Sequence, residues 1–214
     1  MKRYLLLLPA LIGSIMANED LQVKIAEDIP YVKINDSGVE VKISRIQDTY
    51  NRLSDDFTRT SRPCTPHCIQ PIKLMDGVQT VGELELIDFI KNKVYTKKGL
   101  LVDARLKKMF QLETIPGAIN IPFTVATVKS EKVKKALFKA LGAKDKGDGT
   151  FDFASAKDLA VFCNGVWCGS SPRFIRSIIA NGYPKEKVLY YRAGLQSWKL
   201  LGLTTVIHKA VEAK

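Results

Sequence analysis

The sequence has few of the residues from which metal centres are built. Its 214 residues include four cysteines and only two histidines, His67 and His208. Structural zinc sites take four cysteine or histidine ligands, and haem attachment needs the order C-x-x-C-H. The stretch from Cys64 to Cys68 has the order C-x-x-H-C, which excludes haem attachment and leaves a zinc site short of ligands. We therefore expect no metal and no cofactor.

The sequence also lacks a nucleic-acid-binding motif, although it carries a formal net charge of +11. Its lysines are scattered along the chain, and no stripe of aromatic and basic residues accompanies them. Such a balance favours general solubility first and attraction of small anionic substrates second, so we expect no nucleic acid partner. With 46% hydrophobic and 26% charged residues, the composition is that of an ordinary globular protein.

The apolar run near the N-terminus is too short to cross a bilayer comfortably. Two basic residues precede it, it extends from Tyr4 to Met16, and Ala17 ends a tolerable cleavage site. This pattern is typical of a secretory signal peptide, here residues 1–17. No cysteine follows the cleavage site, so we expect a periplasmic or secreted protein without a stable membrane anchor after processing. An uncleaved anchor or a buried N-terminal helix is the alternative.

Residues 18–82 are expected to form a separate, β-rich N-terminal region. Apolar and polar residues alternate on both sides of Asn35–Gly38, which predicts a small β-hairpin. The region ends in a stretch dense in proline and cysteine, with Cys64 and Cys68 in a C-x3-C arrangement. An oxidising compartment favours a disulfide between these two cysteines, while free thiols and a metal site that includes His67 are the alternatives.

The stretch Leu159–Ile179 carries the chemistry that the sequence offers. Its first four residues are an apolar run that predicts a buried strand, and Cys163 follows directly. Ser171 as the N-cap and Pro172 as the first helical residue predict a helix, and Gly182 ends it. The sequence therefore predicts a strand, a cysteine-bearing loop and a helix in succession.

A cysteine between a strand and the start of a helix is well placed to ionise. It lies near the positive end of the helix dipole and among the N–H groups of the loop. Both favour the thiolate, which is the nucleophilic form. We therefore expect Cys163 to be the nucleophile and to have the lower pKa of the two cysteines in this loop. The alternative is that Cys163 is only a small apolar residue at the end of a strand.

Four segments, in this order, resemble the rhodanese family of sulfurtransferases. They are LLVDAR (100–105), TIPGAINIPF (114–123), the cysteine loop with its helix, and the closing stretch 181–203. Glu113 and Thr114 stand where the family usually has Gly-His, and Ala193 replaces the first of two paired glycines. The resemblance covers about half of the chain.

The resemblance implies an α/β domain with a central parallel sheet flanked by helices, here residues 83–207, followed by a tail at 208–214. It also implies a persulfide on Cys163 and supporting roles near the site for Asp103, Arg105 and Arg173. The loop residues expected to bind the substrate are Asn164, Gly165, Val166, Trp167, Gly169 and Ser170. Their N–H groups would stabilise an anionic sulfur as an oxyanion hole does.

A second cysteine, Cys168, gives the loop C-x4-C spacing and makes it longer than is usual in the family. We prefer Cys163 as the nucleophile because it alone adjoins the strand. Cys168 is then a resolving thiol, whose attack on a Cys163 persulfide releases sulfide and leaves a disulfide. Space filling, or an oxidised and inert pair, is the alternative. Phosphatases of this fold need C-x5-R, but Gly169 stands at the arginine position, so we do not expect phosphatase activity.

Three further helices are predicted from the spacing of apolar residues. They are Glu83–Lys91, Ser130–Leu141 and Leu195–Leu201. In the first, Leu84, Ile87 and Ile90 are expected to share the buried face. In the last, Trp198 is expected to anchor the core.

We expect a sulfurtransferase that carries sulfane sulfur as a persulfide on Cys163. Its partners would be small sulfur-containing anions or thiol acceptors, and a protein acceptor stays open. A thiol–disulfide redox protein that uses Cys163 and Cys168 is the second hypothesis. A non-catalytic binding module is the third.

Overall fold

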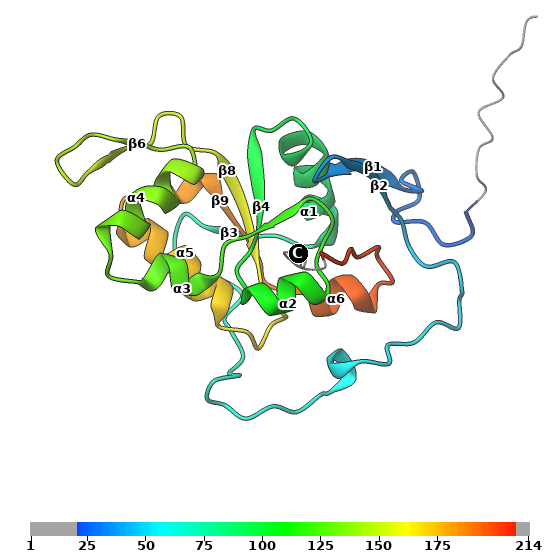
Figure 1. Ribbon diagram of the computed structural model, residues 1–214. Helices are drawn as coiled ribbons and strands as arrows, with labels where there is room; N and C mark the ends of the chain where they lie inside the picture. Colours follow the sequence, from blue (N-terminus) through cyan, green and yellow to red (C-terminus); the bar gives the residue numbers. More distant parts are fainter. Residues whose placement is uncertain (1–20, 209–214) are drawn as a thin grey trace, which may run out of the picture.

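The computed structural model describes residues 21–208, and its centre is a five-stranded parallel sheet (Figure 1). The strands lie in the order β3-β9-β8-β4-β5. Their bounds are β3 Gln79–Thr80, β9 Val188–Tyr191, β8 Asp158–Phe162, β4 Gly99–Asp103 and β5 Ala118–Asn120. The middle strands β4 and β8 are buried almost throughout, as parallel strands covered on both faces are. The predicted α/β class with a central parallel sheet is confirmed.

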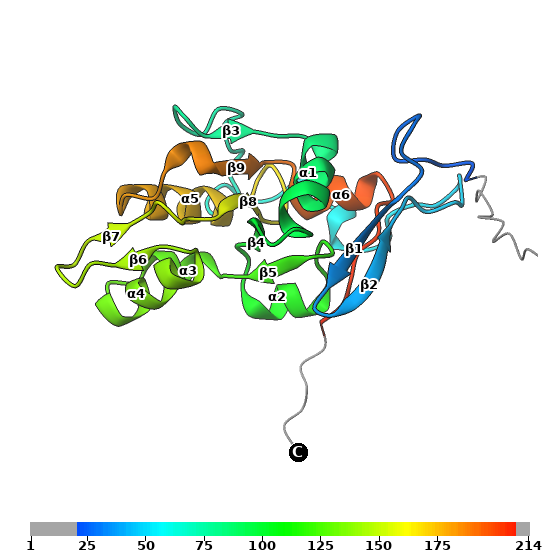
Figure 2. The ribbon, with the colours of Figure 1, turned by 90° about the horizontal axis from the view of Figure 1, so that it is seen from above.

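Helices cover both faces of the sheet and make two cores (Figure 2). The first core contains α3 Phe123–Thr127, α4 Glu131–Ala140 and α5 Ser170–Ala180. The second contains α1 Glu83–Phe89, α2 Lys107–Leu112 and α6 Gly194–Leu200. Within β8, Val161 packs in the first core, while Ala160 and Phe162 pack in the second. Strand β8 therefore lies between the two cores, and the residue after it, Cys163, lies at the carboxyl end of the sheet.

The first predicted helix is present, but its buried face differs from the prediction. Leu84 is half exposed, whereas Leu86 and Ile87 are buried together with Phe89 and Ile90. A helix turns about 100° per residue, so Leu84 lies roughly 120° away from Ile90 around the axis. The helix also continues beyond Phe89 as a π-helical turn, Ile90–Val94. The choice of Leu84 as a core position was therefore wrong.

The other two predicted helices are confirmed as α4 and α6. Helix α4 buries Leu137 and is followed by Gly142, whose φ of 89° suits the stop that ends the helix. Trp198 on α6 is completely buried and anchors the second core, as expected. The remaining short elements are β6 Lys144–Asp145, β7 Phe151–Asp152 and two 3-10 turns, Asp56–Thr58 and Lys185–Lys187.

The N-terminal region contains the expected hairpin, formed by β1 Val32–Asp36 and β2 Val39–Ile43. Ile34 and Ile43 are buried in the second core, so the hairpin packs on the main body of the protein. Strand β3 lies N-terminal to the predicted domain boundary at residue 83, yet it pairs with β9 at the edge of the sheet. The boundary itself stays a prediction.

The expected signal peptide, residues 1–17, lies outside the described residues, and so does the expected mature N-terminus at residue 18. Of the predicted tail, 208–214, only residue 208 is described. Within residues 21–208, no helix is both long and apolar enough to cross a membrane.

Candidate active site

The cysteine loop lies at the carboxyl end of β8, where it is held by the start of α6. Strand β8 ends at Phe162, and the loop runs from Cys163 to Gly169. The amide of Leu195 donates to the carbonyl of Cys163 at 2.9 Å, and the amide of Gln196 donates to that of Asn164 at 2.8 Å. The first two residues of the loop are therefore fixed by α6, whose N-terminal amides have no partners within their own helix.

The departure from the paired glycines of the family is explained by the backbone at the start of α6. Gly194 has a φ of 62°, and a Cβ atom there would lie 2.4 Å from the carbonyl oxygen of Cys163. Only glycine fits this position without a shift of the loop. Ala193 has a φ of −65° and a ψ of −28°, an ordinary helical conformation that any residue adopts. The first glycine can therefore be replaced, while the second cannot.

Helix α5 begins earlier than the sequence predicted. Gly169 is its N-cap and Ser170 its first residue, since the amide of Arg173 already donates to the carbonyl of Gly169 at 3.1 Å. The assignment of Ser171 as the N-cap was therefore wrong, and Pro172 is the third helical residue. Freed from capping, the Ser171 hydroxyl lies 3.0 Å from the Sγ atom of Cys163. The first turn of the helix thus meets the thiol directly.

Both loop cysteines are free thiols at the start of α5, and they differ in exposure. Cys163 is 1% exposed and Cys168 is 6% exposed. The Sγ atom of Cys163 lies 3.3 Å from the carbonyl oxygen of Cys168. The two thiols also interact directly, so that the charge on one alters the other. Both thiols are buried, and Cys168 keeps the larger exposed fraction.

Of the two thiols, Cys168 is the one that loses its proton at the lower pH. A hydrogen bond from the Cys163 thiol lowers the pKa of Cys168 to about 6, helped by the N–H groups of Ser170 and Asn164 and opposed by burial. Burial, and then the neighbouring Cys168 thiolate, raise the pKa of Cys163 well above its usual range. The expectation that Cys163 has the lower pKa was therefore wrong. The N–H groups of the loop reach the second cysteine, and complete burial keeps the first one protonated.

Most of the remaining loop residues bind other parts of the protein. The Val166 carbonyl accepts a hydrogen bond from the amide of Gln70 at 2.8 Å. The Trp167 indole donates to the side chain of Gln196 at 2.8 Å, and Gly165 packs against that same side chain. Among the loop residues expected to bind substrate, Asn164 and Ser170 are the two whose N–H groups interact with Cys168.

Asp103 and Arg105 form a buried ion pair beneath the loop. The Arg105 Nη2 atom lies 2.6 Å from Asp103 Oδ2, and Thr114 donates to the same oxygen at 2.8 Å. Thr114, at the position where the family usually has histidine, thus completes the bonding of the carboxylate. Arg105 also donates to the side chain of Asn164 at 3.3 Å. The pair joins the end of β4 to the second residue of the loop.

A segment from outside the loop crosses over it, which the sequence did not predict. We call residues 62–70 the strap. The guanidinium of Arg62 lies 4.0 Å from the centre of the Trp167 ring, and the ring of His67 meets the same indole edge-on at 5.3 Å. Gln70 bonds Val166 as described, and its own carbonyl accepts from Arg192 at 2.9 Å. Its density in proline and cysteine is the only sequence signal that marks the strap.

The C-x3-C pair lies within the strap. The Sγ atoms of Cys64 and Cys68 are at bonding distance, as a disulfide would require. The ring of His67 faces Trp167, and the described residues contain no group of three potential metal ligands. This geometry favours the disulfide among the three interpretations, and its presence in the isolated protein stays a prediction.

Two polar side chains flank the exposed side of the loop next to Cys168. A Cβ atom on Gly169 would lie 3.8 Å from Arg173 Nε and 3.9 Å from Gln70 Nε2. The guanidinium of Arg173 also lies 5.6 Å from the ring centre of Phe123. Arg173 therefore lies beside Gly169, the residue that follows Cys168, and its supporting role stays a prediction.

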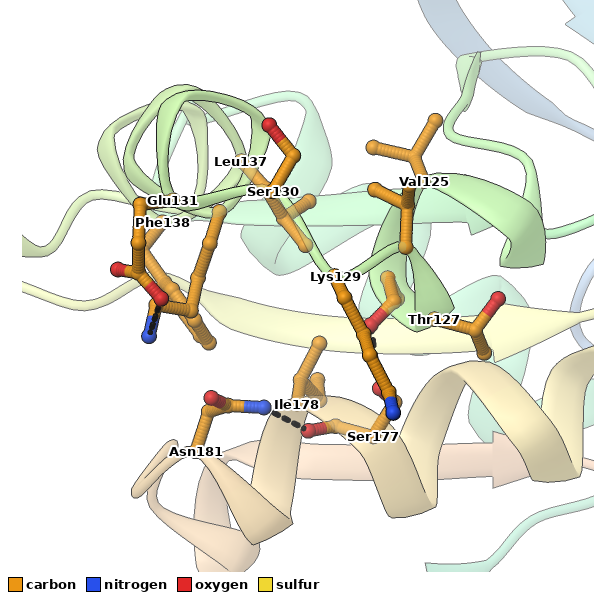
Figure 3. A pocket seen from close by; sticks show the side chains of 13 residues that line it. Val125, Thr127, Lys129, Ser130, Glu131, Leu137, Phe138, Ser177, Ile178 and Asn181 are labelled. Carbon is orange, nitrogen blue, oxygen red and sulfur yellow. Dashed lines mark hydrogen bonds and ion pairs between the residues drawn. The ribbon is translucent and has the colours of Figure 1, made fainter.

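Two cavities are relevant to the site: one lies near the carboxyl end of the sheet, and the other lies among the helices of the first core. One of about 220 Å³ adjoins the loop and is lined by Phe57, Arg105, Met109, Asn164 and Trp167, among others. The other, of about 310 Å³, lies between the α3–α4 segment and α5 (Figure 3). Its lining includes Lys129, Ser177 and Asn181 but no cysteine or histidine. The smaller cavity also has no cysteine in its lining, but it shares Asn164 and Trp167 with the loop, so it is the cavity that adjoins the two thiols.

Residues 85–201 match the sequence model of a family described as the rhodanese-like domain. No curated protein matches the chain. Among solved structures, a Bacillus halodurans protein is 16% identical, with 64% of this chain and 81% of that one covered and a TM-score of 0.43. Thiosulfate sulfurtransferase of Pseudomonas aeruginosa is 17% identical, with 62% and 21% covered and a TM-score of 0.38. A 3-mercaptopyruvate sulfotransferase of Escherichia coli is 19% identical, with 56% and 43% covered and a TM-score of 0.38.

Proposed function

The chain belongs to the rhodanese-like domain family, and we propose that it transfers sulfane sulfur through the Cys163–Cys168 pair. The observation that supports this proposal is the division of labour between the two thiols. Both thiols are buried, but the pKa of Cys168, the slightly more exposed one, is lowered to about 6, whereas burial raises the pKa of Cys163, which is hydrogen-bonded to it. A thiolate attacks sulfur, and a second thiol that interacts with it can resolve the product.

The first step loads sulfur onto Cys168. Its thiolate attacks the outer sulfur of a donor such as thiosulfate, the Sγ–S bond forms, and the S–S bond of the donor breaks to release sulfite. The product is a persulfide anion on Cys168, so the total charge is unchanged. The N–H groups of Asn164 and Ser170 that now stabilise the thiolate would stabilise this anion. Arg173, close to Gly169, supplies positive charge for an anionic donor.

The sequence assigned the persulfide to Cys163 and the resolving role to Cys168, and we propose the reverse. Cys163 is the less exposed of the two, and its thiol is held protonated by burial. A thiol attacks poorly in that form. In the second step, Cys163 attacks the Sγ atom of Cys168 and sulfide leaves. Small thiols that take the sulfur directly are the competing acceptors.

Mass spectrometry of the intact protein after incubation with thiosulfate tests this function. The fully reduced protein should gain one sulfur atom, and the same gain should persist in Cys163→Ser, which has lost the resolving thiol. Cys168→Ser should gain none. Sulfur on Cys168→Ser but not on Cys163→Ser would restore the assignment made from the sequence. A loss of two hydrogens without any release of sulfite or sulfide would indicate a thiol–disulfide redox protein, and no change at all would indicate a binding module.

We also propose that the protein works outside the cytoplasm, on the basis of the signal-peptide pattern in residues 1–17. N-terminal sequencing of exported protein should begin near Asn18. An intact Met1 on cytoplasmic protein would contradict the proposal. It would also weaken the case for a Cys64–Cys68 disulfide, which depends on an oxidising compartment.

A further inference from the structure

Tyr190 lies beside the thiol pair although no motif singles it out. It belongs to β9 and is paired with Val161 of β8, both in the first core. Side chains two residues apart along a strand direction point to the same face, so Cys163, two residues after Val161, follows on the side of Tyr190. Helix α5, whose first turn carries Ser171, packs against this same face through Phe174 and Ile175.

The hydroxyl of Tyr190 is buried without a partner. The side chain is 0% exposed, and its oxygen makes no hydrogen bond within the described part of the chain. The two other fully buried tyrosines differ in this respect. Tyr183 donates to the carbonyl of Lys157, and Tyr191 donates to Glu83 at 2.9 Å. A buried unpaired hydroxyl costs stability, so a small movement that brings it within hydrogen-bond reach of a neighbouring oxygen would be favourable.

The polar neighbours of this hydroxyl show which group could accept its hydrogen bond. Burial raises the pKa of Tyr190, and negative charge on Cys163 raises it further, with Arg192 acting in the opposite direction. The group therefore stays protonated and acts as a donor. Ser171 interacts with both Tyr190 and Cys163, and its oxygen is 3.0 Å from the sulfur. The hydroxyl of Ser171 is thus the link between the tyrosine and the buried thiol.

We infer that Tyr190 is a positioning residue for the second step, in which Cys163 becomes the nucleophile. Tyr190 donates to Ser171, and Ser171 donates to the sulfur of Cys163 as that sulfur loses its proton. The inference rests on the proposed function, because only the resolving step places negative charge on Cys163. At rest the charge is on Cys168, and the tyrosine hydroxyl has nothing to stabilise.

The step balances within the pair. The Sγ atom of Cys163 forms a bond to the Sγ atom of Cys168, and the bond from Cys168 to its outer sulfur breaks. The proton of Cys163 leaves with the outer sulfur as hydrosulfide. The two cysteine sulfurs are oxidised to a disulfide, and the sulfane sulfur is reduced to sulfide. A dithiol reductant must then reopen the disulfide before another turnover.

Single-turnover sulfide release from the full-length protein tests the inference. Reduced protein is loaded with thiosulfate, freed of donor by rapid desalting, and followed by sulfide detection and intact mass. Tyr190→Phe should load one sulfur at the wild-type rate, because Cys168 is unchanged. It should then release sulfide about 10- to 100-fold more slowly, the effect expected for a lost hydrogen bond to a charged group.

Two matched variants separate this role from a structural one. Tyr190→Phe removes an unpaired hydroxyl, so its midpoint of urea unfolding should not fall. Tyr191→Phe removes a paired hydroxyl on the opposite face, so its midpoint should fall while sulfide release stays at the wild-type rate. Ser171→Ala should slow release as Tyr190→Phe does, and the double variant should be no slower than either, because both break one chain of hydrogen bonds.

Sulfide release from Tyr190→Phe at the wild-type rate would overturn the inference and leave the proposed function standing. A fall in the unfolding midpoint together with equally slowed loading and release would overturn it too, since that is the signature of a structural hydroxyl. If the wild-type protein takes up no sulfur from thiosulfate or from a persulfide donor, the proposed function fails and this inference fails with it.

Discussion

Replacing Gly194 by alanine should disturb the loop from the opposite side of the site. Gly194 has a φ of 62°, which costs an L-residue roughly 1–2 kcal/mol. The new Cβ atom would lie 2.4 Å from the Cys163 carbonyl, so the loop must move away from α6. That movement sacrifices the hydrogen bonds from Leu195 and Gln196, worth about 1 kcal/mol each. The variant should therefore be roughly 3–4 kcal/mol less stable than the wild type.

Gly202→Ala is the matched control for this prediction. Gly202 has a similar φ of 65°, but the nearest atoms to an added Cβ, those of Ile46, lie at 3.5 Å. It should cost only the backbone term, about 1–2 kcal/mol in urea unfolding. Movement of the loop in Gly194→Ala should also take the Asn164 amide away from Cys168 and raise the pH midpoint of its alkylation. If the two alanine variants are equally stable and share one alkylation profile, the close approach of α6 to the loop is not real.

Three further outcomes are expected. Asp103→Asn leaves the buried Arg105 without its charged partner, so the free energy of unfolding in urea should fall by about 3–5 kcal/mol. Sulfur uptake per folded molecule should stay unchanged. A fall in the free energy of unfolding of less than about 1 kcal/mol would contradict this prediction. Alkylation of Cys168 should rise as the pH increases through about 6, because the thiolate forms above its pKa, and a rate still climbing steeply above pH 8 would argue against it. Denatured protein from an oxidising compartment should show two free thiols, and four would refute the Cys64–Cys68 disulfide. Because this disulfide closes a short loop, it should raise the free energy of unfolding by less than ~3 kcal/mol.

The fold could be predicted because its signals are local. An apolar run before Cys163 specifies β8, glycine and helical spacing specify α5, and both lie within one continuous stretch. The supporting role of Asp103 and Arg105 came instead from the resemblance of LLVDAR to the first core strand of the family. Errors arose at the ends of elements: the chemistry of Ser171 suits an N-cap, and the sequence therefore predicts the start of the helix too late. The first turn begins at Ser170, and the hydroxyl of Ser171 contacts the thiol of Cys163.

The relative acidity of the two cysteines could not be predicted, because it depends on packing between distant segments. Adjacency to the strand suggested Cys163, but adjacency also buries it completely. Which amides reach which sulfur is set by the path of the loop, and α6 fixes that path from a later part of the sequence. The unpaired hydroxyl of Tyr190 has no sequence signature at all, since Tyr191 next to it looks identical and is satisfied by Glu83.

The strap has a practical consequence for anyone who prepares this domain. The family match begins at residue 85, so a recombinant fragment cut there would lose the strap, β3 and the hairpin together. The indole of Trp167 would lose its cover, and β9 would become an unpaired sheet edge of the kind that recruits other chains. A fragment trimmed to the homologous core should aggregate, and its thiols should no longer report the chemistry of the intact protein. Expression should therefore start near residue 21.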